Sequence, residues 1–165
     1  MQRLIERLPA LQNLWYNIRE RLVEINALGI FTNLFFTQIL PECWNSPYST
    51  ASFPIYAEEV PSIGHSPNAD KSPSTFFLCK KAKENSVWIV GGSIPEREEE
   101  RLYNTCLIID NTGSIVGKHR KIHLFDIDVP GRIKFKESDA LSAGHSPTII
   151  ESPWGPIGVG ICYDI

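Results

Sequence analysis

Short runs of β-branched and aromatic residues, each ended by a turn sequence, are the feature that most constrains this fold. Such runs are typical of buried strands, and turn residues between them mark where the chain reverses. They predict strands at residues 30–40, 87–90, 105–109, 114–116, 148–151 and 157–161. The turn sequences at 110–113 and 153–155 join the last four of these strands into two hairpins.

Helical patterns alternate with these strands. One stripe of apolar residues recurs at steps of four and three and predicts a helix at about residues 9–28: Leu4, Leu8, Leu11, Trp15, Ile18, Leu22 and Ile25. This heptad-like spacing fits a coiled coil, but a helix packed on a sheet is favoured for so short a repeat. A second helix is predicted at 75–84, and the Ser-, Pro- and Gly-containing segment 61–74 is interpreted as an inserted surface loop. We therefore predict an α/β fold in which residues 1–165 form a single domain.

Composition narrows the classes of partner. The 165 residues carry 16 basic and 19 acidic side chains, a net charge of −3, which gives no electrostatic reason to expect nucleic acid or an anionic membrane surface. The longest apolar run is too short to span a bilayer. A small-molecule partner is the prediction that remains.

The four cysteines indicate a reducing compartment. They lie far apart without CxxC spacing, which argues against a zinc site or a disulfide framework. The N-terminal residues show no targeting segment, since acidic residues are mixed with the arginines. We expect a cytoplasmic protein and leave mitochondria open as a second location.

The segment 157–164 has the pattern of a strand that delivers a thiol into a turn. Ile157, Val159 and Ile161 alternate with glycines, and Cys162 follows directly. Glycines beside a strand-end thiol allow close approach of backbone and substrate. A cysteine in such a place is a candidate nucleophile, although a lone cysteine is more often a small buried residue.

Amide hydrolysis needs a nucleophile, a proton carrier and a positive group for the oxyanion. Cys162, Glu42 and Lys121 are the candidates for these three roles. Taken singly, Lys121 and Glu42 are more often solvated loop charges. His123, Asp126 and Asp128 are possible metal ligands by residue type, but loop acids beside Pro130-Gly131 more often form turn hydrogen bonds.

Longer strings decide between these interpretations. The chain resembles the nitrilase superfamily of carbon-nitrogen hydrolases in its three signature segments, Leu40-Pro41-Glu42, Arg120-Lys121-Ile122-His123-Leu124-Phe125-Asp126 and Gly160-Ile161-Cys162-Tyr163-Asp164. Four further strings are similar to the omega-amidase branch: residues 42–48, 91–96, 102–105 and 125–131. The resemblance implies a nitrilase-type four-layer α-β-β-α sandwich.

The resemblance also implies a mechanism and a site. Glu42, Lys121 and Cys162 would form a catalytic triad that works through a thioester, with Glu137 as a second glutamate. The substrate pocket would include Tyr48, Tyr103, Phe125 and Tyr163. The implied substrates are alpha-ketoglutaramate and alpha-ketosuccinamate, cleaved to a keto acid and ammonia. No metal or organic cofactor is implied, and the full-length protein is expected to be a homodimer.

The chain departs from the family pattern at both ends. No strand is predicted before the first helix, and the superfamily fold continues beyond the nucleophile, so we expect an incomplete sandwich covering about the N-terminal half to two-thirds. Uncovered apolar faces and open strand edges would favour aggregation. Two alternatives to an omega-amidase therefore stay open: an inactive truncated isoform that binds a full-length homologue, and another hydrolase of the same superfamily.

Overall fold

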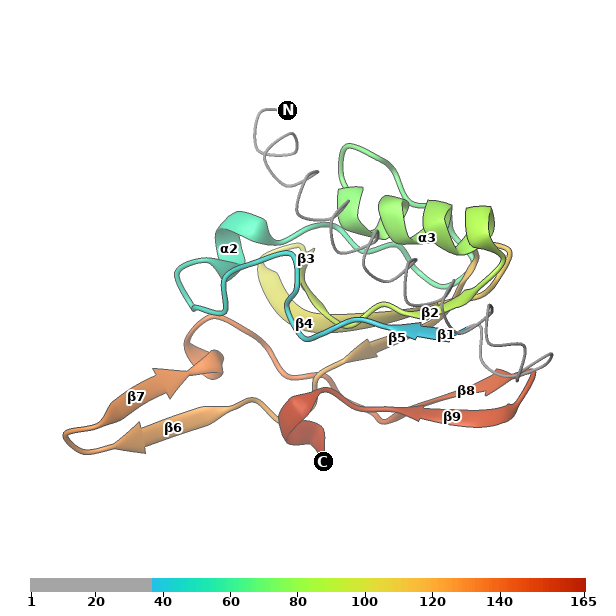
Figure 1. The fold of residues 1–165 in the computed structure, drawn as a ribbon. Coiled ribbons are helices and arrows are strands. Elements are labelled where there is room, and N and C mark those ends of the chain that lie inside the picture. The colour runs from blue at the N-terminus through green and yellow to red at the C-terminus, as the bar shows by residue number, and fades with distance from the viewer. Residues whose placement is uncertain (1–36) are drawn as a thin grey trace, which may run out of the picture. The chain divides into compact units, whose positions relative to one another are not determined.

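The computed structural model describes residues 37–165. The predicted helix at 9–28 and most of the predicted strand at 30–40 lie outside the described residues. The described chain contains a central mixed sheet, two separate hairpins and a few helices (Figure 1). No helix in this part of the chain is long and apolar enough to cross a membrane.

The central sheet has five strands, and β4 (Arg101–Ile109) is the one on which the others assemble. Three strands pair with β4 in antiparallel orientation: β2 (Trp88–Val90), β3 (Ile94–Glu98) and β5 (Ile115–Arg120). The short strand β1 (Thr37–Ile39) pairs in parallel with β2. Eight of the nine residues of β4 are buried, as expected for a strand covered on both faces.

Different elements cover the two faces of this sheet. Helix α3 (Pro73–Asn85) packs on β2 and β4, and the hairpin of β8 (Thr148–Ser152) and β9 (Gly155–Val159) lies on the opposite side (Figure 1). Cys106 and Ile108 of β4 meet Ile150 and Ile161 in the core between the sheet and this hairpin. The succession of helix, sheet and second β layer confirms the predicted nitrilase-type architecture in part.

Helix α3 begins and ends where local chemistry allows. Pro73 occupies the first turn, where its missing N–H is harmless, and Ser86 ends the helix in the left-handed conformation. The buried Glu58 carboxylate accepts the Ser74 N–H at 2.8 Å, which satisfies an unpaired donor of the first turn. The predicted helix at 75–84 is confirmed. Because α3 starts at Pro73, the last two residues of the 61–74 loop belong to the helix instead.

Three strands were not predicted from the sequence. Strand β3 follows Gly91-Gly92, and β6 (Asp126–Val129) and β7 (Ile133–Lys136) form a hairpin. Polar and apolar residues alternate in both arms of that hairpin, but four-residue arms are too short to stand out in sequence. The hairpin projects away from the central sheet (Figure 1). A short helix α2 (Phe53–Tyr56) packs near its base through buried Phe53.

Gly92 allows the chain to approach the turn before Glu42. Its φ is +58°, and an added Cβ would lie 2.1 Å from the Pro41 carbonyl oxygen. Gly131 is a matched control, since its φ is +70° but nothing lies within 4 Å of an added Cβ. We expect Gly131→Ala to destabilise by about 1–2 kcal/mol through backbone strain alone. Gly92→Ala should cost about 1–3 kcal/mol more through overpacking, measured by urea unfolding; equal losses would contradict this.

Candidate active site

A buried ammonium group lies at the centre of the site. Lys121 follows β5 directly and is fully buried, and its Nζ lies 2.9 Å from Glu42 Oε1 and 3.0 Å from Glu137 Oε2. Glu42 comes from the turn after β1, and Glu137 opens the 3-10 helix η1 (Glu137–Asp139). Burial lowers the pKa of Lys121, but hydrogen bonds to both carboxylates outweigh it and raise the pKa overall. Lys121 is therefore a fixed cation at neutral pH.

Glu42 is held by a second donor besides Lys121. The side-chain amide of Asn104, a fully buried residue of β4, donates to Glu42 Oε1 at 2.8 Å. The Asn104 carbonyl oxygen also accepts the Lys121 N–H at 2.8 Å. The sequence did not predict the contact of Asn104 with Glu42. The available signal was an asparagine directly before the apolar run at 105–109.

Glu137 is fully buried, and each of its oxygens is satisfied. The Tyr48 hydroxyl donates to Oε1, and the Phe125 N–H donates to Oε2 at 2.6 Å. Burial and the hydrogen bond to Glu137 raise the pKa of Tyr48, so its hydroxyl stays protonated and remains a donor. The second glutamate predicted from resemblance thus lies against Lys121.

Cys162 opens the 3-10 turn η2 (Cys162–Asp164) beyond the end of β9 and has a φ of +48°. Positive φ is uncommon for a residue with a Cβ and costs about 1–3 kcal/mol. Cys162 is the exposed cysteine of the described chain, whereas Cys43, Cys79 and Cys106 are buried. Partial burial and the negative charge of Glu42 raise the pKa of Cys162 against the opposing effect of Lys121. The resting group is a thiol.

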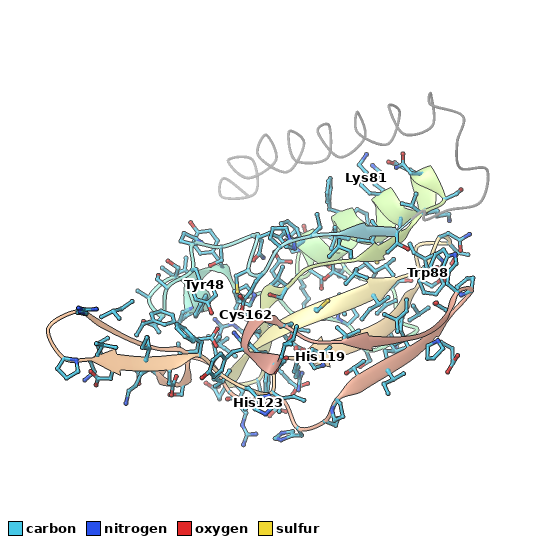
Figure 2. The ribbon with its side chains drawn as sticks, turned by 60° about the horizontal axis from the view of Figure 1, so that its bottom comes forward. Tyr48, Lys81, Trp88, His119, His123 and Cys162 are labelled. Carbon is cyan, nitrogen blue, oxygen red and sulfur yellow. The ribbon has the colours of Figure 1, made fainter. Side chains whose placement is uncertain are left out.

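Asp164 fixes the turn that carries Cys162. Its Oδ1 accepts the N–H groups of Ile122 and His123 at 2.9 and 2.8 Å, and its Oδ2 accepts the Ile161 N–H at 3.0 Å. His119, a residue of β5, lies beside η2 (Figure 2), with its Nε2 2.9 Å from Asp164 Oδ2. Asp164 therefore ties the turn of Cys162 to the segment just after Lys121. This role was missed, because spacing alone does not show a carboxylate turning back onto backbone amides.

Burial alone would raise the pKa of Asp164. Hydrogen bonds from His119 and from backbone N–H groups oppose that effect, and the pKa is lowered to about 2. The carboxylate is consequently ionised near neutral pH, and it keeps all of these hydrogen bonds.

Aromatic side chains form one side of the site. The exposed Tyr163 ring meets Phe125 edge to face at 5.6 Å, and Phe125 lies 6.2 Å from Phe135 of β7. Tyr48 stacks on Phe135 at 5.5 Å. Three of the predicted pocket residues therefore gather near the site.

The structure does not bring Tyr103 to this cluster. It is buried on β4 with the Arg120 guanidinium 3.8 Å from its ring centre. Neighbouring strand residues point to opposite faces, so Asn104 faces the triad and Tyr103 faces away from it. Arg120 is in turn fixed by Glu96 and Glu98.

The acids considered as metal ligands have protein partners. Asp126 accepts hydrogen bonds from Ser138, Asp128 pairs with Lys134 at 3.5 Å, and the His123 ring lies 3.3 Å from Asp164. Residues 37–165 contain no cluster of histidine, cysteine and acidic side chains that could hold a metal ion.

Several known proteins are similar to this chain. The family model for carbon-nitrogen hydrolase matches residues 38–165. The chain belongs to the carbon-nitrogen hydrolase family. It is 56% identical over 127 residues to the chloroplastic omega-amidase of Arabidopsis thaliana and 52% identical over 126 residues to omega-amidase NIT2 of Xenopus tropicalis. These matches cover 77% and 76% of this chain.

The chain spans only 33% and 42% of the lengths of those two relatives. Among solved structures, Saccharomyces cerevisiae Nit3, a member of the nitrilase superfamily, matches with a TM-score of 0.64 and 35% identity. That match covers 88% of this chain and 48% of the Nit3 chain. The carbon-nitrogen hydrolase fold is thus present over the part that the structure describes.

The buried ion pairs should dominate local stability. Lys121→Met leaves the carboxylates of Glu42 and Glu137 without their cation, and removing one partner of a buried pair costs about 3–5 kcal/mol. Lys134→Met is the matched control, because its pair with Asp128 is exposed and contributes about 0–1 kcal/mol. Urea unfolding of both variants checks this. Similar losses in the two variants would show that the buried cation is not the stronger contact.

Asp164 should make the free energy of unfolding depend on pH in the acidic range. Its folded pKa of about 2 lies below the ordinary 3.8, so its contribution of about 2 kcal/mol is complete above pH ~4 and is lost as the pH falls towards 2. Asp164→Asn lacks this dependence. Unfolding of both proteins between pH 6 and 2 should show their stability difference shrinking in acid; a constant difference would contradict the assignment.

Proposed function

We propose that this chain carries the catalytic centre of an omega-amidase-type amide hydrolase, with Cys162 as nucleophile. The observation that supports it best is the fixed ammonium of Lys121, held between Glu42 and Glu137 and acting on the exposed thiol. The relatives named omega-amidase give the reaction class, and the terminal amides of alpha-ketoglutaramate and alpha-ketosuccinamate are the proposed substrates.

The first half-reaction begins with a protonated thiol. Because the pKa of Cys162 is raised, sulfur can attack the amide carbon only as Glu42 takes its proton. The carbonyl oxygen becomes an oxyanion, which the Lys121 ammonium stabilises in this partly dehydrated site. Collapse breaks the C–N bond, and Glu42 passes the proton to the departing nitrogen. The products are ammonia and a thioester on Cys162.

The second half-reaction uses the same groups with water. Glu42 takes a proton from water as the oxygen attacks the thioester carbon, and Lys121 again balances the oxyanion. The C–S bond then breaks, the acid is released, and the sulfur regains its proton from Glu42. Glu137 keeps Lys121 charged throughout and transfers no proton.

The test is ammonia release from the two keto-acid amides. Cys162→Ser should abolish turnover, and Glu42→Gln should lower kcat by about 10²–10⁴-fold because the proton carrier is lost. Cys79→Ala, which removes a buried thiol of α3 outside the site, should keep the activity. Added hydroxylamine should be acylated by the thioester, giving a hydroxamate detectable by mass spectrometry.

Two results would overturn the proposal. Turnover that persists in Cys162→Ser would exclude the thioester route. Hydrolysis of other amides or of nitriles, with no release from either keto-acid amide, would instead favour another activity of the same family.

A further inference from the structure

Asn104 contacts Glu42 through its side chain and Lys121 through its backbone. Its side-chain Nδ2 donates to Glu42 Oε1 at 2.8 Å, and its backbone oxygen accepts the Lys121 N–H at 2.8 Å. It lies on β4, the strand to which three other strands pair, and is fully buried. Few positions in a sheet are held more firmly, so the direction of its amide is well fixed.

The Asn104 amide is not explained by stability. Its Oδ1 is buried and has no hydrogen-bond partner. A buried polar atom without a partner destabilises a fold. Rotating the amide would not help, because Oδ1 would then face the carboxylate oxygen of Glu42. The side chain therefore keeps an unfavourable atom in order to present its N–H group to Glu42.

This contact makes the two oxygens of Glu42 unequal. Oε1 receives both the Asn104 amide and the Lys121 ammonium. Among the described residues, no N–H or O–H group donates a hydrogen bond to Oε2. A proton added to the carboxylate goes to the oxygen that is not already accepting two hydrogen bonds.

We propose that Asn104 is a positioning residue that occupies Glu42 Oε1 and so leaves Oε2 to exchange the proton of Cys162. The role rests on the proposed function, in which Glu42 is the proton carrier. Asn104 touches neither the thiol nor the substrate, and it acts through the orientation and charge balance of Glu42.

The reactivity of the Cys162 thiol reports this effect without any turnover. The charged groups that act on it are Glu42 and Glu137, which disfavour the thiolate, and Lys121, which favours it. Removing the N–H donor leaves the negative charge of Glu42 less balanced, so the thiolate becomes harder to form. Iodoacetamide alkylation in the folded protein, followed by mass spectrometry of the Cys162 peptide between pH 6 and 10, measures this directly. The other three cysteines are buried.

The deciding experiment compares Asn104→Leu in the full chain with and without Glu42→Gln. Alone, Asn104→Leu should raise the midpoint of the alkylation profile by about half a pH unit. At pH 7 this makes the alkylation of Cys162 about threefold slower. In the Glu42→Gln background the shift should vanish, because no carboxylate charge remains for Asn104 to balance. Asn104→Ala removes the same donor and serves if the leucine variant does not fold.

Asn45 provides the matched control. It is another buried asparagine that donates to a buried glutamate, Glu58, at 3.2 Å and leaves its Oδ1 without a partner. Asn45→Leu should leave the alkylation profile of Cys162 unchanged, since neither residue contacts the triad.

Two outcomes would overturn the role of Asn104: an equal shift in both backgrounds, which indicates a structural effect, or no shift in either. These results are separable from the proposed function. Ammonia release that survives Glu42→Gln would remove the catalytic assignment, whereas the alkylation profile would still show whether Asn104 governs Glu42.

Discussion

The ion pairs of the buried Lys121 ammonium are the interactions on which the rest of the site depends. A fully buried cation is tolerated only with opposite charges and good hydrogen bonds, and Glu42 and Glu137 supply both. Those carboxylates need donors of their own, which come from Asn104, Tyr48 and Phe125. Segments far apart in the chain are thereby fixed to one point at the end of the central sheet.

Partial burial and the charge balance at this point together keep Cys162 a thiol. Burial is the larger cause of its raised pKa, and the negative charges of Glu42 and Glu137 add to it against the opposing effect of Lys121. The thiol is therefore unlike a cysteine next to an uncompensated cation, where the thiolate is the resting form. The proposed mechanism therefore needs a proton carrier within the site, and Glu42 is the carboxylate that is still partly exposed. Asp164 keeps the turn of Cys162 beside this charge cluster.

The sequence was most informative where patterns are long or chemically strict. The helix at 75–84, the hairpin of β8 and β9, and the turn after the last strand were predicted from apolar periodicity and turn residues, and the structure confirms them. Strand β3 and the β6–β7 hairpin were missed because their apolar faces are short. Tyr103 was placed in the pocket by family resemblance, but the alternation of β4 turns it to the other face.

The residue types of the site were readable from the sequence alone: a thiol after a glycine-rich strand, a lysine in a long family string and a glutamate after proline. Only the tertiary structure decided which hydrogen-bond partners these groups have. A strand passing under the site brings in Asn104, and Asp164 folds back onto the amides that follow Lys121. Asn104 and Glu42 lie 62 positions apart, and Asp164 and His123 lie 41 apart, so no local pattern encodes these contacts. They exist because a buried charge has to find every hydrogen bond within the folded chain.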